Sequence, residues 1–188
     1  MSKVYVNRSR IHGLGVFAAV TLKPGEPVLA IDDSRLVTPT NPLRPGEEEM
    51  HCDYLADCIV VLMQEPERYI NHSCDPNSFV RSLHGIRYVL ARKTIYIGEE
   101  ITYDYSMNSC SDFVWHCDCG SARCRFTITA DFFQLSYLQQ LEYLPLLETW
   151  FIEENKLEID RLLTRALGDD VRPATHEPIA PYSESTNR

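Results

Sequence analysis

Three cysteines within eight residues are the feature of this chain with the clearest chemistry. Cys117, Cys119 and Cys124 follow the pattern Cys-x-Cys-x4-Cys in a polar stretch. Three thiols in such a loop cannot all be buried as small hydrophobic side chains, and thiolates are preferred ligands of zinc. A zinc ion bound by four thiolates requires one more cysteine from elsewhere, and Cys74 is the best candidate.

Three other segments carry groups that could contact a ligand. Residues 71–77 read Asn-His-Ser-Cys-Asp-Pro-Asn and end in a turn sequence. Residues 100–105 alternate as a strand does, which places Tyr103 and Tyr105 on one face. The Gly-Leu-Gly sequence at residues 13–15 permits close approach of the backbone to a ligand, since glycine has no Cβ. Taken singly, these segments have ordinary readings as a strand exit, core packing and a hairpin turn.

Taken together and in this order, the segments resemble the SET-domain protein-lysine methyltransferases, over roughly residues 3–126. The cysteine run resembles the post-SET segment that follows the catalytic core in that family. The resemblance implies a mainly β (β+α) fold of several small sheets, with a knot-like threading near the cofactor and a post-SET zinc loop. It also implies methyl transfer from S-adenosylmethionine (SAM) to the side-chain amine of lysine in a protein substrate.

The resemblance assigns roles to the two tyrosines. Tyr105 matches the catalytic tyrosine of the family. Tyr103 matches the position where tyrosine restricts the product to mono- or dimethyl-lysine, because its hydroxyl holds the amine or a water where further methyl groups would have to fit. Phenol oxygens can orient an amine without competing with it as nucleophiles. We therefore expect mono- or dimethylation.

The resemblance also implies which residues bind SAM and zinc. The loop at residues 13–15 would hold the methionine part of SAM, Asn71 would bind through its side-chain amide, and His72 through backbone groups near the adenine. The expected cofactor-binding residues are Gly13, Leu14, Gly15, Asn71, His72, Tyr105, Trp115 and Phe126. The expected zinc ligands are Cys74, Cys117, Cys119 and Cys124. Leu14 departs from the Arg, Lys or Trp frequent in the family, and Phe126 from a frequent glycine.

The substrate amine must lose a proton before it attacks, since its ordinary pKa is about 10.4. No side chain in the motifs is an obvious base. The neighbouring sulfonium and an apolar lysine channel would both lower the pKa of the amine, and the proton would leave through water. The sequence therefore predicts catalysis by orientation and desolvation.

Composition narrows the class of protein and of partner. The 188 residues, of which 44% are hydrophobic, suffice for one catalytic domain with a core. A formal charge of −9 disfavours nucleic acid and favours a basic, lysine-containing protein substrate such as a histone, although acidity for solubility explains the charge equally well. No apolar stretch approaches the ~20 residues that cross a bilayer, and no signal peptide is evident, so we expect a soluble, intracellular protein, with the cytoplasm favoured over the nucleus. The zinc site leaves Cys52, Cys58 and Cys110 as free thiols, which fits a reducing compartment.

The order of elements predicts short strands followed by helices. The β segments are expected at residues 3–6, 13–20, 28–31, 58–63, 78–83, 87–91 and 100–105. Leucines and aromatics recur at helical spacing from Asp131 to Leu167, interrupted by Pro145, and should pack against the β core. The predicted organisation is a SET domain at 1–108, a post-SET segment at 109–126, a helical extension at 127–167 and a disordered tail at 168–188.

Two other functions stay open. The chain could be a catalytically silent SET module that binds a protein partner, although the intact tyrosines favour an enzyme. It could also be a thiol enzyme in which His72 activates Cys74. Zinc content tests the thiol-enzyme alternative, because a metal-bound Cys74 is not a free nucleophile. The sequence leaves the oligomeric state open.

Overall fold

The computed structural model describes residues 2–170. The chain divides into a first unit that ends at Glu154 and a second that begins at Asn155, and each is described by itself. The tail predicted at 168–188 lies outside the described residues from position 171 on. Among the described helices, none is long and apolar enough to cross a membrane.

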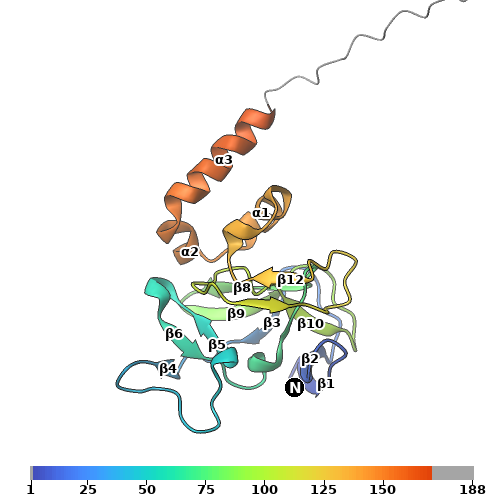
Figure 1. Ribbon diagram of the computed structural model, residues 1–188. Helices are drawn as coiled ribbons and strands as arrows, with labels where there is room; N and C mark the ends of the chain where they lie inside the picture. The colour runs from blue at the N-terminus through green and yellow to red at the C-terminus, as the bar shows by residue number, and fades with distance from the viewer. Residues whose placement is uncertain (1, 171–188) are drawn as a thin grey trace, which may run out of the picture. The chain divides into compact units, whose positions relative to one another are not determined.

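Four small sheets make up most of the first unit (Figure 1). The strands of the largest sheet, in spatial order, are β1 (Val4–Arg8), β2 (Leu14–Ala18), β10 (Glu100–Tyr103) and β7 (Asn71–His72). The second sheet contains β3 (Pro27–Ala30), β9 (Ile86–Ala91) and β8 (Ser78–Leu83). The third contains β4 (Leu36–Val37), β6 (Val60–Leu62) and β5 (Cys52–Tyr54), and the fourth is the hairpin of β11 (Val114–His116) and β12 (Thr127–Thr129). The prediction of a mainly β fold of several small sheets is confirmed.

The pairing of β10 with β7 brings two of the sequence motifs together. The two strands are parallel, with Thr102 opposite Asn71 and Tyr103 opposite His72. β10 also pairs with β2, which carries the second glycine of the Gly-Leu-Gly loop. Three segments far apart in the sequence therefore meet in one sheet.

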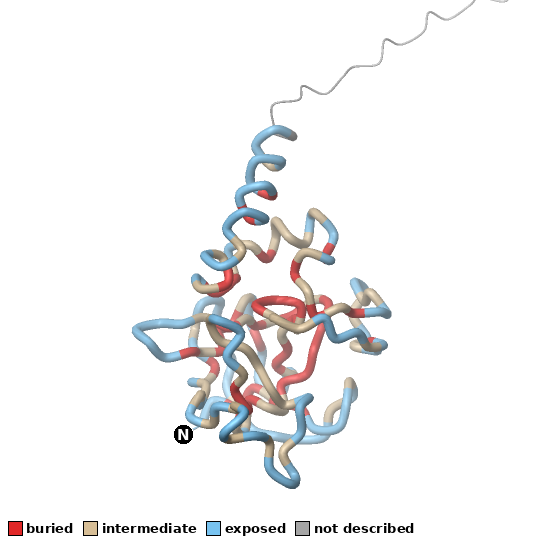
Figure 2. The backbone as a smooth tube through the Cα atoms, turned by 60° about the vertical axis from the view of Figure 1, so that its left-hand side comes forward, coloured by how far each residue is buried: buried red, intermediate tan, exposed pale blue. Residues whose placement is uncertain are grey.

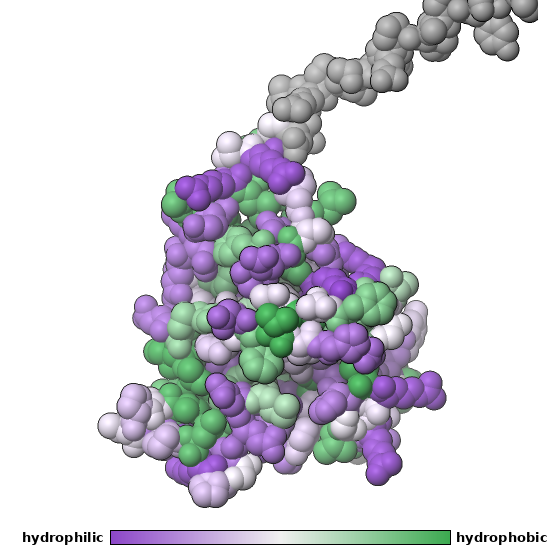
Figure 3. Space-filling view, in the orientation of Figure 1, coloured by the Kyte–Doolittle hydropathy of each residue, from purple (hydrophilic) through white to green (hydrophobic). Residues whose placement is uncertain are grey.

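A hydrophobic core lies beneath these strands. Val16, Val89, Ile95 and Ile101 are fully buried in it. Figure 2 shows the buried segments concentrated in the middle of the first unit. On the face seen in Figure 3, hydrophilic residues are interspersed with hydrophobic ones, and the hydrophobic ones gather over β4 and β6.

Helices follow the last strand, as the sequence predicts. They are α1 (Tyr137–Tyr143), α2 (Thr149–Glu154) and α3 (Lys156–Asp170), and Pro145 lies in a 3₁₀ turn between the first two. The Ser136 hydroxyl accepts a hydrogen bond from the backbone of Gln139 and so caps α1. Tyr143 of α1 is fully buried, and its hydroxyl donates to the carbonyl of Cys74. The predicted packing of the helical region against the β core is thus confirmed for α1, while α3 belongs to the second unit.

Two strand predictions need correction. β10 ends at Tyr103 rather than at Tyr105, because the chain turns at Asp104, whose side chain accepts a hydrogen bond from the backbone N–H of Ser106. In the apolar run 58–63 only Val60–Leu62 is a strand, because Asp57 and Cys58 have the positive φ values of 57° and 51° within a 3₁₀ turn.

The prediction that Cys58 and Cys110 are free thiols is wrong. The two form a disulfide with their Cα atoms 5.7 Å apart, a separation that suits such a bond. They stand 52 residues apart in the sequence, so only the fold brings them together. Cys52 is free, as predicted.

Candidate active site and metal centre

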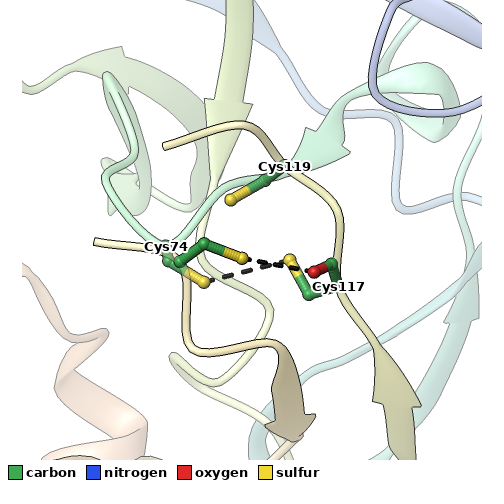
Figure 4. A group of neighbouring side chains, drawn as sticks. Cys74, Cys117 and Cys119 are labelled. Atoms are coloured by element: carbon green, nitrogen blue, oxygen red, sulfur yellow. Dashed lines mark hydrogen bonds between the residues drawn. The ribbon is translucent and has the colours of Figure 1, made fainter. Parts of the chain in front are cut away.

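Four cysteines converge where the chain leaves β7 and where it crosses between β11 and β12. The sulfur atoms of Cys74, Cys117, Cys119 and Cys124 all lie within 4.8 Å of one another. Cys74 and Cys117 are buried, with their sulfurs 3.9 Å apart. Figure 4 shows the sulfurs of Cys74, Cys117 and Cys119 directed toward one another.

The donor set suits zinc. Four thiolates at about 2.3 Å from a central ion in tetrahedral geometry would be about 3.8 Å apart, close to the spacing observed. Burial raises the pKa of the Cys74 and Cys117 thiols, so a bound cation is needed to stabilise their ionised forms. The raised pKa of Cys74 also speaks against its use as an activated thiol nucleophile.

His72 connects the cysteine cluster to the catalytic segment. Its Nδ1 accepts a hydrogen bond from the backbone N–H of Tyr105 at 3.1 Å, and its Nε2 lies 3.4 Å from the Cys74 sulfur. Burial lowers the pKa of His72 to about 4, against a smaller opposing effect of Asp104. A neutral ring that accepts at Nδ1 carries its proton on Nε2 and can donate to the sulfur. His72 is therefore held by the protein at both nitrogens.

A buried ion pair ties the cysteine loop to the end of β10. Asp104 is fully buried, and its Oδ1 lies 2.8 Å from Nη2 of Arg125, directly after the last cysteine. The backbone N–H of Arg125 also donates to the Cys74 sulfur at 3.4 Å. Strand alternation at residues 100–105 places Asp104 on the face away from the tyrosines, but no sequence motif singles out Arg125. The arginine has no distinctive spacing in the sequence, so the fold alone identifies its partner.

The two tyrosines lie together, as the alternation predicts, with ring centroids 5.1 Å apart. The Tyr105 hydroxyl donates to the Ile70 carbonyl at 2.7 Å. The Tyr103 hydroxyl lies 3.5 Å from the sulfur of Met63. Burial raises the pKa of both phenols above the ordinary tyrosine range. Both hydroxyls therefore stay protonated at neutral pH and act as hydrogen-bond donors.

The Gly-Leu-Gly loop is held against β7 and β10. The Asn71 amide nitrogen donates to the carbonyls of His12 and Leu14 at 3.1 and 2.9 Å. The same nitrogen lies 2.8 Å from Oε1 of Glu100. A Cβ at Gly15 would lie 2.9 Å from Cδ of Glu100, so a larger residue there would displace the carboxylate that Ser9 and Asn71 bind. Asn71 thus fixes the loop, and in this structure its amide hydrogens are directed at protein acceptors.

The two flanking aromatics differ in position. The Trp115 ring lies 5.5 Å from that of His72 and 5.8 Å from that of Tyr105, so it belongs to the site. Phe126 is 64% exposed, and its φ of 63° falls in the left-handed region that favours glycine. The family preference for glycine at this position has a backbone explanation here.

A cavity of about 230 Å³ opens beside the tyrosines. Two chain segments supply most of its lining, one from the region of β5 and one that follows β10. The lining residues are Glu49, Met50, Cys52, Asp53, Tyr54, Met63, Tyr103, Tyr105, Met107, Ser109, Ser111, Phe113, Trp115 and Ala130. None of these described residues is Lys or Arg, while two are acidic. The residues that line the cavity come from segments that are remote in sequence, so sequence motifs could not predict it.

Comparisons with known proteins show which family and which relatives the chain is similar to. Residues 13–106, half of the chain, match the SET domain family. Human histone-lysine N-methyltransferase 2B is 34% identical over 139 residues, which cover 65% of this chain and 5% of the human protein. The histone-lysine N-methyltransferase mes-4 of Caenorhabditis elegans is 42% identical over 74 residues, which cover 32% of this chain and 8% of that protein. A solved histone methyltransferase structure from Plasmodium falciparum has 24% identity and a TM-score of 0.45, and covers 56% of this chain and 94% of that one.

Proposed function

The chain belongs to the SET-domain family, and we propose that it transfers methyl groups from SAM to the side-chain amine of lysine in a protein substrate. The observation that carries this proposal is the pair of protonated phenols, Tyr103 and Tyr105, at one cavity next to the Asn71-His72 strand. The chain spans only about 5% of the human relative's length, so its activity and substrate are inferred from the site itself.

The residues around β7 fit a bound SAM. The loop at residues 13–15, Asn71, His72 and Trp115 would hold it. Phe126 would contribute from the post-SET segment. A Cβ on Gly13 would meet nothing within 4 Å, which leaves room next to the loop, whereas Gly15 lies against protein. When bound, SAM supplies an electrophilic methyl group on a positively charged sulfur.

The protein's own contribution is to orient the amine and to exclude water. Tyr105 has a fixed position, because its hydroxyl bonds to the Ile70 carbonyl and its backbone N–H to His72. Met63, Met107 and Trp115 give the cavity apolar walls, which lower the pKa of an entering lysine. Orientation and desolvation of this kind supply catalysis without a general base.

Tyr103 is the proposed determinant of product degree. Its hydroxyl lies 3.5 Å from the Met63 sulfur, a weak acceptor, so the hydroxyl remains able to donate to an amine or a water. A hydroxyl that holds such a group occupies the space a third methyl would need. We accordingly propose mono- or dimethylation.

The proposed substrate is a lysine in a basic protein, such as a histone. The chain carries a net charge of −9, and the cavity lining contributes Glu49 and Asp53. Asp53 is already paired with Arg87, which leaves Glu49 as the carboxylate best able to meet a substrate cation.

We assign residues 1–108 to the SET domain, 109–126 to the post-SET segment and 127–167 to the helical extension, whose first residues, Thr127–Thr129, form β12 and whose first α-helix begins only at Tyr137. Zinc held by Cys74, Cys117, Cys119 and Cys124 would fix the post-SET segment on the core. Through it, Trp115 would be kept beside His72 and Tyr105.

Comparison of two tyrosine variants tests the proposal. Purified protein is incubated with labelled SAM and a panel of basic proteins, and lysine methylation is read by mass spectrometry. Tyr105→Phe should lower transfer by at least about a hundredfold, as expected for loss of a positioning group. Tyr96→Phe, at a tyrosine that is 60% exposed, is the matched control and should retain activity. Full activity of Tyr105→Phe would contradict the assigned role. Binding of SAM and of basic proteins without transfer would favour a silent binding module.

A further inference from the structure

A disulfide connects the chain just after one segment that lines the cavity to a second segment that lines it. One segment runs from Glu49 to Tyr54 and includes β5, and the other runs from Met107 to Phe113. Cys58 follows the first segment within the 3₁₀ turn η2 (Ala56–Cys58), and Cys110 lies inside the second. We propose that the Cys58–Cys110 disulfide positions these two segments for substrate binding. This inference rests on the proposed function.

The turn that carries Cys58 is attached firmly to the cavity lining. The backbone N–H of Leu55 donates to the carbonyl of Ile59 at 2.9 Å, which closes a short loop directly after β5. β5 in turn pairs with β6, with Tyr54 opposite Val60. A displacement of Cys58 is therefore transmitted to β5 rather than absorbed by a long linker.

The second segment is attached just as closely on the other side of the bond. Cys110 stands between Ser109 and Ser111, which both line the cavity. Three residues earlier in the chain is Met107, another lining residue, whose backbone N–H donates to the carbonyl of Asp104. The cross-link thus reaches the chain that leads from Tyr105 to the post-SET segment.

The backbone on both sides of the bond adopts conformations that non-glycine residues rarely hold. Asp57, Cys58 and Asn108 have φ values of 57°, 51° and 57°. Residues in this region carry backbone strain and persist where surrounding contacts fix them. Loss of the cross-link would remove one of these contacts and let both segments relax.

Other contacts remain when the bond is broken, so the fold should survive. The backbone N–H of Asp57 donates to Glu154 at 2.7 Å. The Asn108 side chain accepts a hydrogen bond from the backbone N–H of Glu148 at 2.8 Å. We therefore expect a change in the order of the two segments rather than unfolding of the first unit.

The bond is chemically accessible, because Cys58 is exposed. A dithiol reductant attacks one sulfur through its thiolate and forms a mixed disulfide. Its second thiol then closes its own ring disulfide. The dithiol loses two electrons and two protons, and Cys58 and Cys110 gain them as two thiols.

The experiment compares oxidised protein, protein reduced by a water-soluble phosphine, and the variant Cys58→Ser/Cys110→Ser. The phosphine is oxidised to its oxide with oxygen from water, and it spares the complication of a dithiol that chelates zinc. Mass spectrometry after alkylation counts thiols in each sample, and zinc content is measured alongside. With a lysine peptide as substrate, reduction should raise the peptide KM about five- to tenfold. In reduced protein the two cavity segments must become ordered when the peptide binds, and this entropic cost weakens binding. We expect kcat and the KM for SAM to change less than about twofold, because Tyr105 and the SAM loop lie outside the cross-linked segments. The serine variant should match reduced protein and should not respond to phosphine.

A second readout does not depend on methyl transfer. Hydrogen exchange should become faster at residues 49–58 and 107–113 after reduction, with no change in β1 and β2. An unchanged peptide KM after verified reduction, no faster exchange at these segments, or an oxidised sample without the disulfide would each overturn the inference. If neither redox state transfers methyl groups, the proposed function fails, and the exchange data alone then decide whether the bond orders the two segments.

Discussion

Removal of the Arg125 guanidinium is the perturbation whose effect follows most directly from the structure. Arg125→Met keeps much of the side-chain volume and deletes the charge that faces Asp104. Asp104 is fully buried and would keep the backbone N–H of Ser106, at 3.0 Å, as its hydrogen-bond partner. A carboxylate left in that position lacks a compensating cation.

The loss of folding stability in Arg125→Met can be estimated from the burial of the ion pair. Breaking a buried ion pair by removing one partner typically costs about 3–5 kcal/mol. The Arg125 side chain is 18% exposed and Asp104 retains one donor, so we expect the lower end, about 3 kcal/mol. For a chain of this size that is a fall in Tm of roughly 6–12 °C.

A neighbouring arginine supplies the matched control. Arg123 pairs with Glu142 at 2.6 Å, but its side chain is 40% exposed. Exposed pairs contribute only about 0–1 kcal/mol, so Arg123→Met should lower the Tm by a few degrees at most. Both variants remove a positive charge next to Cys124, which cancels any general effect of charge on the cysteine loop.

The assay is thermal and urea unfolding of zinc-loaded protein, with zinc content measured for each variant. A double-mutant cycle with Asp104→Asn adds a second check, because removing the stranded charge should recover part of the loss in Arg125→Met. Equal effects of the two arginine variants, or no coupling between positions 104 and 125, would refute the reasoning that this buried pair attaches the cysteine loop to the core.

Four further predictions follow from the same geometry. Tyr103→Phe should shift products toward trimethyl-lysine, read by mass spectrometry, whereas an unchanged product ratio would remove Tyr103 from this role. Because burial raises the pKa of Tyr103 and Tyr105, both phenols should stay protonated while the methyl-transfer rate rises with pH to about 9, as lysine amines lose protons. A methyl-transfer rate that decreases at any pH under 9 would point to ionisation of a phenol. Hydrogen bonding to Arg123 lowers the pKa of Glu142 to about 2. The stability that Glu142 contributes is therefore present above its unfolded pKa of 4.5 and is lost as pH falls toward 2. In urea unfolding, Glu142→Gln should be less stable than the unchanged protein by less than about 1 kcal/mol at pH 7, and this difference should be smaller at pH 4. Phe126→Gly should raise or preserve the Tm by relieving a positive φ, and a loss above about 1 kcal/mol would mean that the phenyl ring itself stabilises the loop.

The parts of the site that short-range sequence patterns encode could be predicted. The cysteine spacing, with Cys74 as the remote partner, predicted a four-sulfur cluster, and the alternation at 100–105 predicted that Tyr103 and Tyr105 lie together. The mainly β fold and the helical C-terminal region also followed, since turn residues and helical periodicity are local signals.

Features that depend on long-range contacts were not predictable in the same way. The Cys58–Cys110 disulfide joins positions 52 residues apart, and an odd count of cysteines does not say which of them pair. The partnership of Asp104 with Arg125 likewise arises where two segments meet in space. The β11–β12 hairpin was missed because polar loop residues and cysteines obscure its alternation.

Transfer of a deuterated methyl group tests the central claim most directly. The intact chain is incubated with SAM labelled in its methyl group and with core histones, and fragment spectra locate any label. The proposed function predicts the label on lysine side-chain nitrogens, limited to one or two methyl groups per lysine. Protein that contains zinc and binds SAM but places no label on any lysine, in histones or in a total cell lysate, would contradict it.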